Sequence, residues 1–334
     1  MSPQRLVPLL TAAASIGAAA AAFAIIHRDA EISGADIQPF KTVFIGIILE
    51  ALPFVLLGVL FSAILQVFVP DELIRRLMPS RPLPAILIAG LAGILFPLCE
   101  CGMIPVVRRL IRKGMPASAG IAYILAGPVV NPVVFYSTYS AFGNAPAMAF
   151  ARTGLAFAVA VLTGVIVWKS MRGNPLKADL ASMYGSAPTR RDELPASAGS
   201  RLISTMAHAS DEFFDMGKYL IFGAALAALF QTAVSRSMLE ELGGSQLYSH
   251  LFLMGLAFLL SLCSTSDAFV AASFGGSFEH GALLAFLVFG PMIDLKSLMM
   301  LLASFRARFV LTAAASAALL VLAGSWIVEA LFLS

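Results

Sequence analysis

The chain has 334 residues, of which 59% are apolar and 12% are charged, and its net charge is +3. A mean hydropathy of +0.90 leaves too little polar surface to cover a water-soluble globule, so hydrocarbon must surround most of the chain. The small net charge gives no reason to expect a nucleic-acid partner. The sequence also lacks the Gly-rich phosphate loop ending in Lys-Ser or Lys-Thr that an ATPase would need.

In chain order, nine apolar runs approach the length needed to cross about 30 Å of bilayer, which is roughly 20 helical residues. A spanning segment must satisfy its backbone hydrogen bonds internally, so each run is predicted to be helical. The predicted fold class is therefore an all-α polytopic membrane protein with about nine membrane segments and broken helices at its centre. The runs lie near residues 6–26, 42–69, 83–98, 116–141, 147–168, 212–235, 247–263, 281–303 and 308–332.

The first run stands apart from the others. Arg5 precedes an alanine-rich stretch that could pass for a signal peptide, but no clean small-residue cleavage site comes before His27. We therefore expect an uncleaved N-terminal transmembrane helix, which lies outside the internal repeat described next.

The other eight runs form two similar units. Glu50 returns as Asp215 and Gly127 returns as Gly290, at nearly the same separation along the chain. Internal duplication is typical of transporters, whose substrate sites form where the repeats face each other near the middle of the bilayer. The predicted organisation is an N-terminal helix and connection at 1–38, a first repeat at 39–168, a linker at 169–205 and a second repeat at 206–334.

The linker at 169–205 is the one long polar segment, and its six basic residues outnumber its three acidic ones. Basic residues next to membrane spans favour the cytoplasmic side, so we expect the linker in the cytoplasm. The orientation of the two repeats stays open. Four complete crossings in each repeat make them parallel, whereas a segment 116–141 that dips in and returns makes them inverted.

The first polar motif lies at residues 96–105, at the end of an apolar run. Prolines and a glycine there, at Pro97, Gly102 and Pro105, predict that the helix stops or bends. Broken helices at membrane depth are tolerated mainly where they line a cavity or are buried in protein. The polar side chains that this motif offers are Cys99, Glu100 and Cys101 in the first repeat, with Cys263, Ser264 and Asp267 in the second.

The second polar motif is also present in both repeats. Glycine and proline open the helical hydrogen-bond ladder and free carbonyl groups, and an amide or a carboxylate follows shortly after. Free carbonyls together with Asn131 and Asp294 can hold a cation or a polar group of a substrate. Lys296 is not on the helical face of Asp294 and is expected to extend to the membrane interface. The predicted helix-breaking residues are Gly127, Pro128 and Pro132 in one copy and Gly290 and Pro291 in the other.

Five carboxylates fall within or beside the apolar runs, at Glu50, Glu100, Asp215, Asp267 and Asp294. Each costs at least about 2.5 to 3.5 kcal/mol at the bilayer centre, so it must face a cavity, find a partner or be protonated. Proton exchange is therefore predicted at Asp267 or Asp294, with Glu50 as a further candidate.

All three cysteines, Cys99, Cys101 and Cys263, belong to the repeated motif. Thiols suit soft, thiophilic solutes and trivalent arsenicals better than hard cations. The spacing does not match a zinc site, because a second pair of cysteines or histidines is missing, so no metal and no cofactor are expected. An alternative interpretation is that the thiols are packing residues and that the Gly-Pro breaks relieve packing.

These motifs together resemble a bacterial permease family that includes the ArsP-type organoarsenical efflux permeases, over most of residues 40–330. The resemblance implies efflux across the inner membrane without an ATPase domain. The first motif of the family usually reads Cys-Ser-Cys-Gly, whereas this chain has Glu100 in place of the serine, which would repel an anionic substrate or add a proton site. The resemblance is carried by Pro97-Leu98-Cys99-Glu100-Cys101-Gly102, Ala126-Gly127-Pro128 with Asn131-Pro132, Cys263-Ser264 with Asp267, and Phe289-Gly290-Pro291-Met292-Ile293-Asp294.

The predicted function is that of a secondary-transport permease with proton-coupled efflux of a small thiophilic or amphipathic solute, such as a trivalent organoarsenical. The alternatives are a permease for another small solute, such as a sulfur compound or a metal complex, and a channel-like membrane subunit of a larger complex. No nucleophile, base and orienting residue are apparent together, so an enzyme is not predicted. The expected partners are a small-molecule substrate and the lipid bilayer, and the sequence leaves open whether copies form a homo-oligomer. The predicted substrate-binding residues are Cys99, Glu100, Cys101, Asn131, Cys263, Ser264, Asp267 and Asp294.

Overall fold

The computed structural model of the chain describes residues 37–68, 79, 81–95, 99–171, 175–176, 198–233, 246–276 and 278–333. The first apolar run and the middle of the predicted linker lie outside the described residues. In the described part all regular structure is helical, apart from an isolated bridge between Leu176 and Phe305. The predicted all-α class is therefore confirmed for these residues, whereas the number of membrane segments stays a prediction.

The helices of the first predicted repeat are α2 (Ile37–Phe68), α4 (Pro82–Leu95), α5 (Glu100–Arg112), α6 (Ala117–Ala126), α7 (Pro132–Ala141) and α8 (Pro146–Ser170). Those of the second are α10 (Ala198–Ala233), α12 (Gln246–Leu260), α13 (Ser266–Ser273), α14 (His280–Met292), α15 (Leu295–Ser304) and α16 (Ala307–Val328), which continues into the π-helical turn η1 (Glu329–Leu333). The order of long and short helices is thus the same in both parts of the chain.

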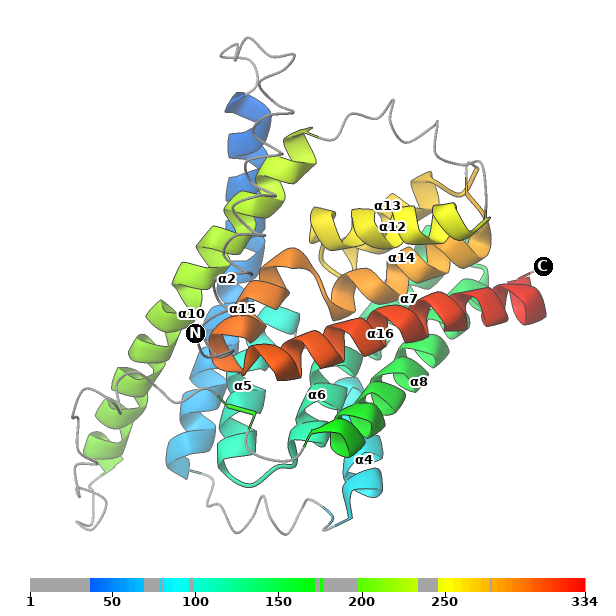
Figure 1. Cartoon of the computed structure of the whole chain (residues 1–334). Helices are drawn as coiled ribbons and strands as arrows, with labels where there is room; N and C mark the ends of the chain where they lie inside the picture. Colours follow the sequence, from blue (N-terminus) through cyan, green and yellow to red (C-terminus); the bar gives the residue numbers. More distant parts are fainter. Residues whose placement is uncertain are drawn as a thin grey trace, which may run out of the picture.

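Two long helices, α2 and α10, pack side by side along one flank of the molecule (Figure 1). Each has a glycine where it meets the first turn of a shorter helix. A Cβ atom on Gly58 would lie 2.3 Å from the carbonyl oxygen of Gly102 in α5, and one on Gly223 would lie 2.8 Å from the Cα of Lys296 in α15. These glycines let the long helices approach the backbones of α5 and α15.

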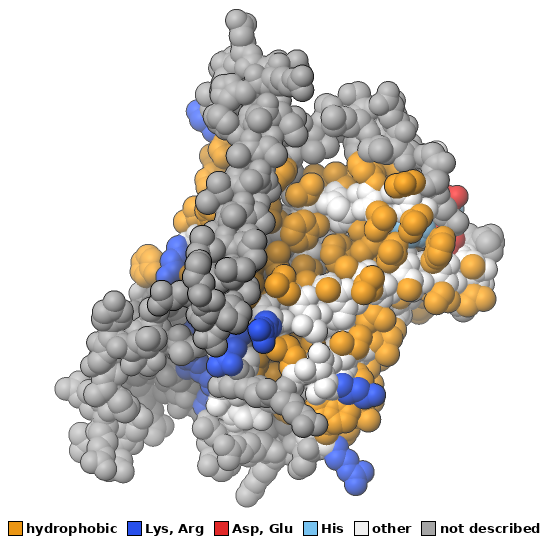
Figure 2. Space-filling view, viewed as in Figure 1, with side chains coloured by type: hydrophobic (Ala, Val, Ile, Leu, Met, Phe, Trp, Pro, Cys, Tyr) orange, Lys and Arg blue, Asp and Glu red, His pale blue; other side chains and the backbone are white. Residues whose placement is uncertain are grey.

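Four helical stretches in the described residues are long and apolar enough to cross a membrane: Gln38–Leu65, Pro146–Ser170, His280–Ser304 and Ala307–Leu331. Shorter apolar helices lie between them. Figure 2 shows hydrophobic side chains over the face formed by α12 and α16, with Lys and Arg gathered towards its lower edge. Such an apolar surface suits contact with lipid. Its large exposed side chains include Leu247, Tyr248, Leu251, Leu311, Leu319 and Trp326.

The predicted runs 116–141 and 281–303 are each divided into two short helices. The first run divides at residues 127–131 between α6 and α7, and Pro132 is the first residue of α7, where a missing N–H costs nothing. The second run divides at Ile293 and Asp294, between α14 and α15. At the second interruption the start of α15 is buried, whereas at the first Asn131 and Val134 are buried and Pro132 and Val133 are exposed.

The breaks near the other predicted residues fall slightly elsewhere. α5 begins at Glu100 and continues through Gly102 and Pro105, so the chain is interrupted before these two residues and not at them. Pro291 likewise lies inside α14, which ends one residue later. Pro97 lies outside the described residues.

Elements of the two predicted repeats contact each other through their short helices. α5 packs against α15, α7 packs against α13, and α14 is in contact with both α6 and α8. Every residue of α14 from Gly281 to Met292 is buried, which places this helix at the centre of the core. The helices α5 and α15, whose starts are buried, therefore pack together, and α7 and α13 pack together with Asn131 and Asp267 buried near their starts.

Candidate functional site

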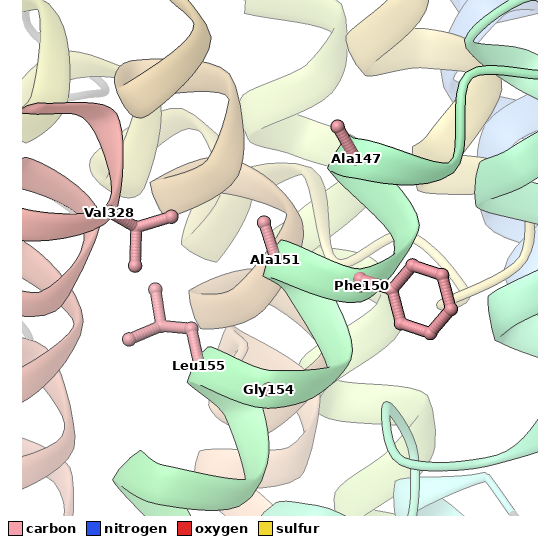
Figure 3. Close-up of a pocket in the computed structure, with 6 residues that line it drawn as sticks. All are labelled: Ala147, Phe150, Ala151, Gly154, Leu155 and Val328. Carbon is pink, nitrogen blue, oxygen red and sulfur yellow. The ribbon is translucent and has the colours of Figure 1, made fainter. Parts of the chain in front are cut away.

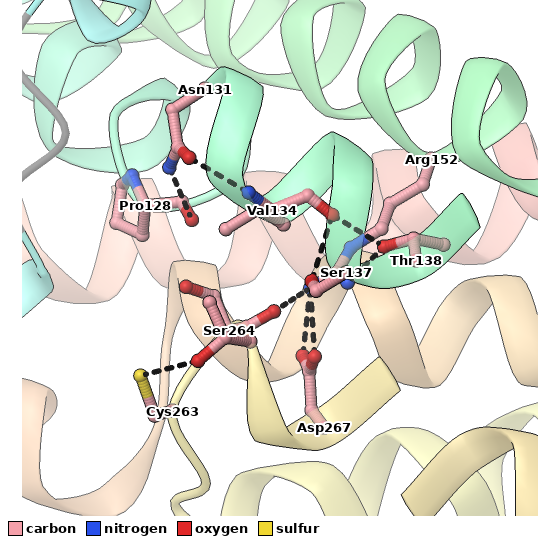
Figure 4. A network of polar contacts seen from close by, with 10 residues as sticks. Pro128, Asn131, Val134, Ser137, Thr138, Arg152, Cys263, Ser264 and Asp267 are labelled. Carbon is pink, nitrogen blue, oxygen red and sulfur yellow. Dashed lines mark hydrogen bonds and ion pairs between the residues drawn. The ribbon is translucent and has the colours of Figure 1, made fainter. Parts of the chain in front are cut away.

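The start of α7 is organised by Asn131, whose side chain is 7% exposed. Its Oδ1 accepts a hydrogen bond from the Val134 N–H at 2.9 Å, and its Nδ2 donates to the carbonyl oxygens of Gly127 at 3.2 Å and Pro128 at 3.3 Å (Figure 4). Asn131 thus caps α7 and satisfies carbonyls that the break would leave free.

The equivalent place in the second repeat is occupied by Asp294, at the start of α15. Its Oδ1 accepts from the Ser297 N–H at 2.6 Å, and the Asp294 N–H donates to Ser297 Oγ at 3.0 Å, which makes a reciprocal capping box. Asp294 is 1% exposed, and its Oδ2 has no hydrogen-bond partner. The two predicted ligands are therefore helix caps, and Asp294 in addition keeps one oxygen for another interaction.

A buried ion pair joins α8 of the first repeat to α13 of the second. The Nη2 of Arg152 donates to the two carboxylate oxygens of Asp267 at 3.0 and 2.8 Å and to the carbonyl oxygen of Ser264 at 3.0 Å (Figure 4). Its Nη1 donates to Thr138 Oγ1 at 2.7 Å. Arg152 and Asp267 are 1% and 2% exposed, so this pair is screened from water and holds α7, α8 and α13 together.

A second buried cluster joins α5 to α15. The ammonium of Lys296 lies 3.3 Å from Glu100 Oε1 and 3.6 Å from Asp294 Oδ2, and it donates to the carbonyl oxygen of Ser261 at 3.0 Å. Ser261 follows α12 and has a positive φ of 49°, a conformation that few non-glycine residues adopt. Lys296 therefore bridges the polar segments of both repeats.

The expectation that Lys296 extends to the membrane interface is wrong, because the residue is 4% exposed. The reason is local backbone geometry. Asp294 has φ −118° and ψ 175°, which is extended, so the spacing of a helical face does not apply between Asp294 and Lys296.

The three thiols are free cysteines and differ in exposure. Cys99 is the residue before α5 and is partly exposed, whereas Cys101 is 1% exposed, and their thiols interact with each other. Cys263 is partly exposed, and its sulfur lies 3.5 Å from Thr265 Oγ1. Among the described residues no group of three or more His, Cys, Asp and Glu side chains could hold a metal ion.

The predicted site residues are therefore distributed over two clusters. Glu100 and Asp294 belong to the Lys296 cluster, and Ser264 and Asp267 belong to the Arg152 cluster. Glu50 is exposed on α2 and belongs to neither. The side chain of Asp215 lies outside the described residues.

Sequence reasoning missed Arg152 and misplaced Lys296, because only carboxylates and thiols in the apolar runs were considered as site residues. The signal was present for Arg152, which is the one charged residue in the run 147–168. A buried carboxylate requires a cation or a proton, so a search for basic residues inside apolar runs would have found it.

A pocket of about 330 Å³ lies between α8 and α16, away from both clusters (Figure 3). All the side chains around it are apolar, and none of the predicted substrate-binding residues lines it. It suits a hydrocarbon group better than a polar solute. Its lining residues are Ala147, Phe150, Ala151, Gly154, Leu155 and Val328.

Spanning helices, an apolar outer surface and buried charges that meet between helices define a multi-pass membrane protein. The particular family follows from comparison with known proteins. Residues 36–330 match the model of the ArsP_1 family, described as a predicted permease, and the chain belongs to this family. It is a membrane permease and not an enzyme, and the family resemblance predicted from the motifs is confirmed.

Two relatives match almost the same share of the chain. "UPF0718 protein YcgR" of Bacillus subtilis is 47% identical over 289 residues, which are 86% of this chain and 96% of that protein. "Putative two-component membrane permease complex subunit" of Streptococcus mutans is 35% identical over 280 residues, or 84% of this chain and 91% of that protein. No solved structure matches the chain significantly.

Proposed function

We propose that this permease is a proton-coupled secondary transporter of the bacterial inner membrane that exports a small thiophilic or amphipathic solute, with its linker 169–205 in the cytoplasm. A trivalent organoarsenical is the leading substrate. The transport path runs between the two repeats, past the starts of the short helices α5, α7, α13 and α15.

One observation carries the proposal: short helices of the two repeats meet inside the protein, with α5 against α15 and α7 against α13. Helix starts and uncovered carbonyls at membrane depth are costly unless they serve a cavity or a partner. In transporters such interrupted helices bind polar groups of the substrate and coupling ions. Movement of one repeat against the other would rearrange both clusters at once, which is what alternating access requires.

The thiols support the substrate class. Cys99 and Cys263 are partly exposed and come from different repeats, so each can reach a solute in the path. The thiols form no preassembled group with other metal ligands in the described part of the chain. Arsenic exchanges thiol ligands, and weak, successive capture permits release more readily than a closed three-thiol site.

The test uses the purified full chain in proteoliposomes with a trivalent methylarsenical and an imposed pH gradient. We expect saturable flux that depends on the gradient, and a large loss of flux when Cys99, Cys101 and Cys263 are all replaced by serine. Ser170→Ala, at an exposed position that ends α8, serves as the matched control. Flux that neither saturates nor responds to the gradient would contradict the carrier, and full flux in the triple serine variant would contradict the role of the thiols.

A second candidate is a subunit of a two-component permease complex, which is favoured by the name of the Streptococcus mutans relative. In that case the purified chain alone transports none of the tested solutes. Activity then returns only when a second subunit, co-purified with the chain from its native membrane, is reconstituted together with it.

A further inference from the structure

The cluster around Lys296 contains more acid than base. Glu100 and Asp294 both lie within ion-pair distance of the single ammonium of Lys296, at 3.3 and 3.6 Å. The side chains of Glu100, Asp294 and Lys296 are 3%, 1% and 5% exposed. One oxygen of each acid, Glu100 Oε2 and Asp294 Oδ2, has no hydrogen-bond partner.

With every group ionised, this buried cluster would carry one uncompensated negative charge. Burying a charge without a counter-ion is unfavourable enough that proteins instead change the protonation state of the group. The other buried cluster shows the contrast. There Arg152 faces Asp267 alone, donates to both of its carboxylate oxygens, and leaves the pair neutral.

We propose that Glu100 and Asp294 together hold one proton beside Lys296, and that this shared site, rather than Asp267, is the proton-coupling site of the permease. Two carboxyl groups that share a site behave in this way, because both cannot ionise without compensation. A metal cation fits poorly as the missing charge, because the ammonium of Lys296 already lies between the two acids and would repel it. A proton needs no further ligands and no additional volume.

The proton belongs on Glu100 rather than on Asp294. Asp294 Oδ1 accepts the Ser297 N–H at 2.6 Å at the positive end of α15, which is an arrangement that holds a carboxylate ionised. Glu100 Oε1 lies 3.3 Å from the ammonium of Lys296, whereas Oε2 has no hydrogen-bond partner and is the atom that we assign to the proton.

Other ionisable groups around the cluster do not supply the missing positive charge. Most of these groups are neutral or acidic. The basic side chains on the neighbouring helices are exposed rather than buried in the cluster. The arginines of α5 itself lie at the opposite end of that helix from Glu100. The ionisable side chains described on the helices that pack against α5 and α15 or within electrostatic range are Lys41 and Glu50 on α2, Tyr123 on α6, Lys218 and Tyr219 on α10, Asp267 on α13, Arg308 on α16, and the thiols of Cys99, Cys101 and Cys263.

The coupling role rests on the proposed function and follows from which of the two predicted repeats contains each residue. Glu100 belongs to the first repeat, whereas Lys296 and Asp294 belong to the second. With the repeats in contact, Lys296 is already balanced by Asp294, so Glu100 keeps its proton. When the repeats separate and water reaches Glu100, its carboxylate is hydrated away from the charge of Asp294, and the proton can leave. The loading of Glu100 is thereby linked to the relative position of the repeats.

The proton itself can be detected without any substrate. Infrared spectra of the reconstituted full chain at neutral pH are expected to contain the C=O stretching band of a protonated carboxylic acid that shifts in D₂O. Glu100→Gln and Asp294→Asn are each expected to abolish that band, because each removes one acid and leaves a neutral cluster. Asp267→Asn is expected to leave the band unchanged.

Two results would overturn the site. One is a wild-type spectrum without the band, and the other is a band that is lost in Asp267→Asn and kept in Glu100→Gln and Asp294→Asn. The coupling role has its own readout. Flux in Glu100→Gln is expected to lose its dependence on the pH gradient, and flux that keeps the wild-type dependence would refute coupling at this site even where the band is present. If wild type shows the band and no flux, the proposed function fails and the shared proton site stands.

Discussion

Replacing Arg152 by Met is expected to destabilise the protein by about 3 to 5 kcal/mol, the cost of leaving a buried charge without its partner. Arg152 donates to Asp267 at 3.0 and 2.8 Å, to the Ser264 carbonyl at 3.0 Å and to Thr138 at 2.7 Å. Most of the loss comes from Asp267, which is 2% exposed and has no water to replace the guanidinium. Thr138 loses less, because its hydroxyl also donates to the Val134 carbonyl at 2.8 Å.

The double variant Arg152→Met/Asp267→Leu separates the charge from the packing. With both charges removed no uncompensated ion remains, so most of the stability should return. A remaining loss of about 1 kcal/mol is expected from the unpaired Ser264 carbonyl. The double-mutant cycle therefore predicts a coupling energy of several kcal/mol between the two residues. Additive effects would show that the pair contributes no net interaction.

The assay is equilibrium unfolding of the purified protein in mixed micelles, followed by the fluorescence of its two tryptophans. Arg308→Met is the matched control, because Arg308 is exposed at the start of α16 and a surface change of this kind alters stability by less than about 0.5 kcal/mol. If Arg152→Met has the same free energy of unfolding as Arg308→Met, the buried pair has no structural role and the reasoning fails.

Two further variants test how the short helices are held. Gly58→Ala should destabilise the protein by about 1 to 3 kcal/mol, because the added methyl group clashes with the Gly102 carbonyl. Gly46→Ala on the same helix is the control, because it has nothing within 4 Å and should be neutral or slightly stabilising. Equal free energies of unfolding for the two variants would contradict the close contact. Asn131→Ala should cost about 0.5 to 2 kcal/mol through loss of the α7 cap, and Asn131→Asp should cost less because it still accepts from Val134; an alanine variant as stable as wild type would show that the cap is unimportant.

The long helices could be predicted from the length of their apolar runs. Runs 42–69 and 147–168 correspond to α2 and α8 within a few residues at each end, because a continuous apolar stretch has one way to satisfy its backbone in lipid. Length could not predict α5 and α13. Both are short, and α5 ends in Arg108, Arg109 and Arg112, which are typical of a surface helix although its first eight residues are buried.

The site was predictable residue by residue but not as pairs. The cost of burying charge singled out Glu100, Asp267 and Asp294 from their positions in apolar runs, and all three are at most 2% exposed. Their partners depend on which helices meet. Arg152 and Asp267 lie in different repeats, as do Lys296 and Glu100, so no local pattern connects the members of either pair. The function of Asn131 as a cap depends on where α7 begins, which the Gly-Pro motif locates only within a few residues.

The two ion clusters bear on how the two predicted repeats pair with each other. When the second repeat is aligned on the first, Asp267 occupies the place of Met103, and Lys296 occupies the place of Val133. Each of these two charges therefore exists in one copy alone. Arg152, the cation beside Asp267, and Glu100, one of the acids beside Lys296, come from the other copy, whereas Asp294 faces Lys296 from its own copy. A symmetric pair of identical first repeats would bury Arg152 opposite an apolar side chain, and a pair of second repeats would leave Asp267 without its cation. Since an unpaired buried charge costs several kcal/mol, the asymmetric charges favour the heterologous pairing that fusion guarantees and disfavour assembly of either half with itself.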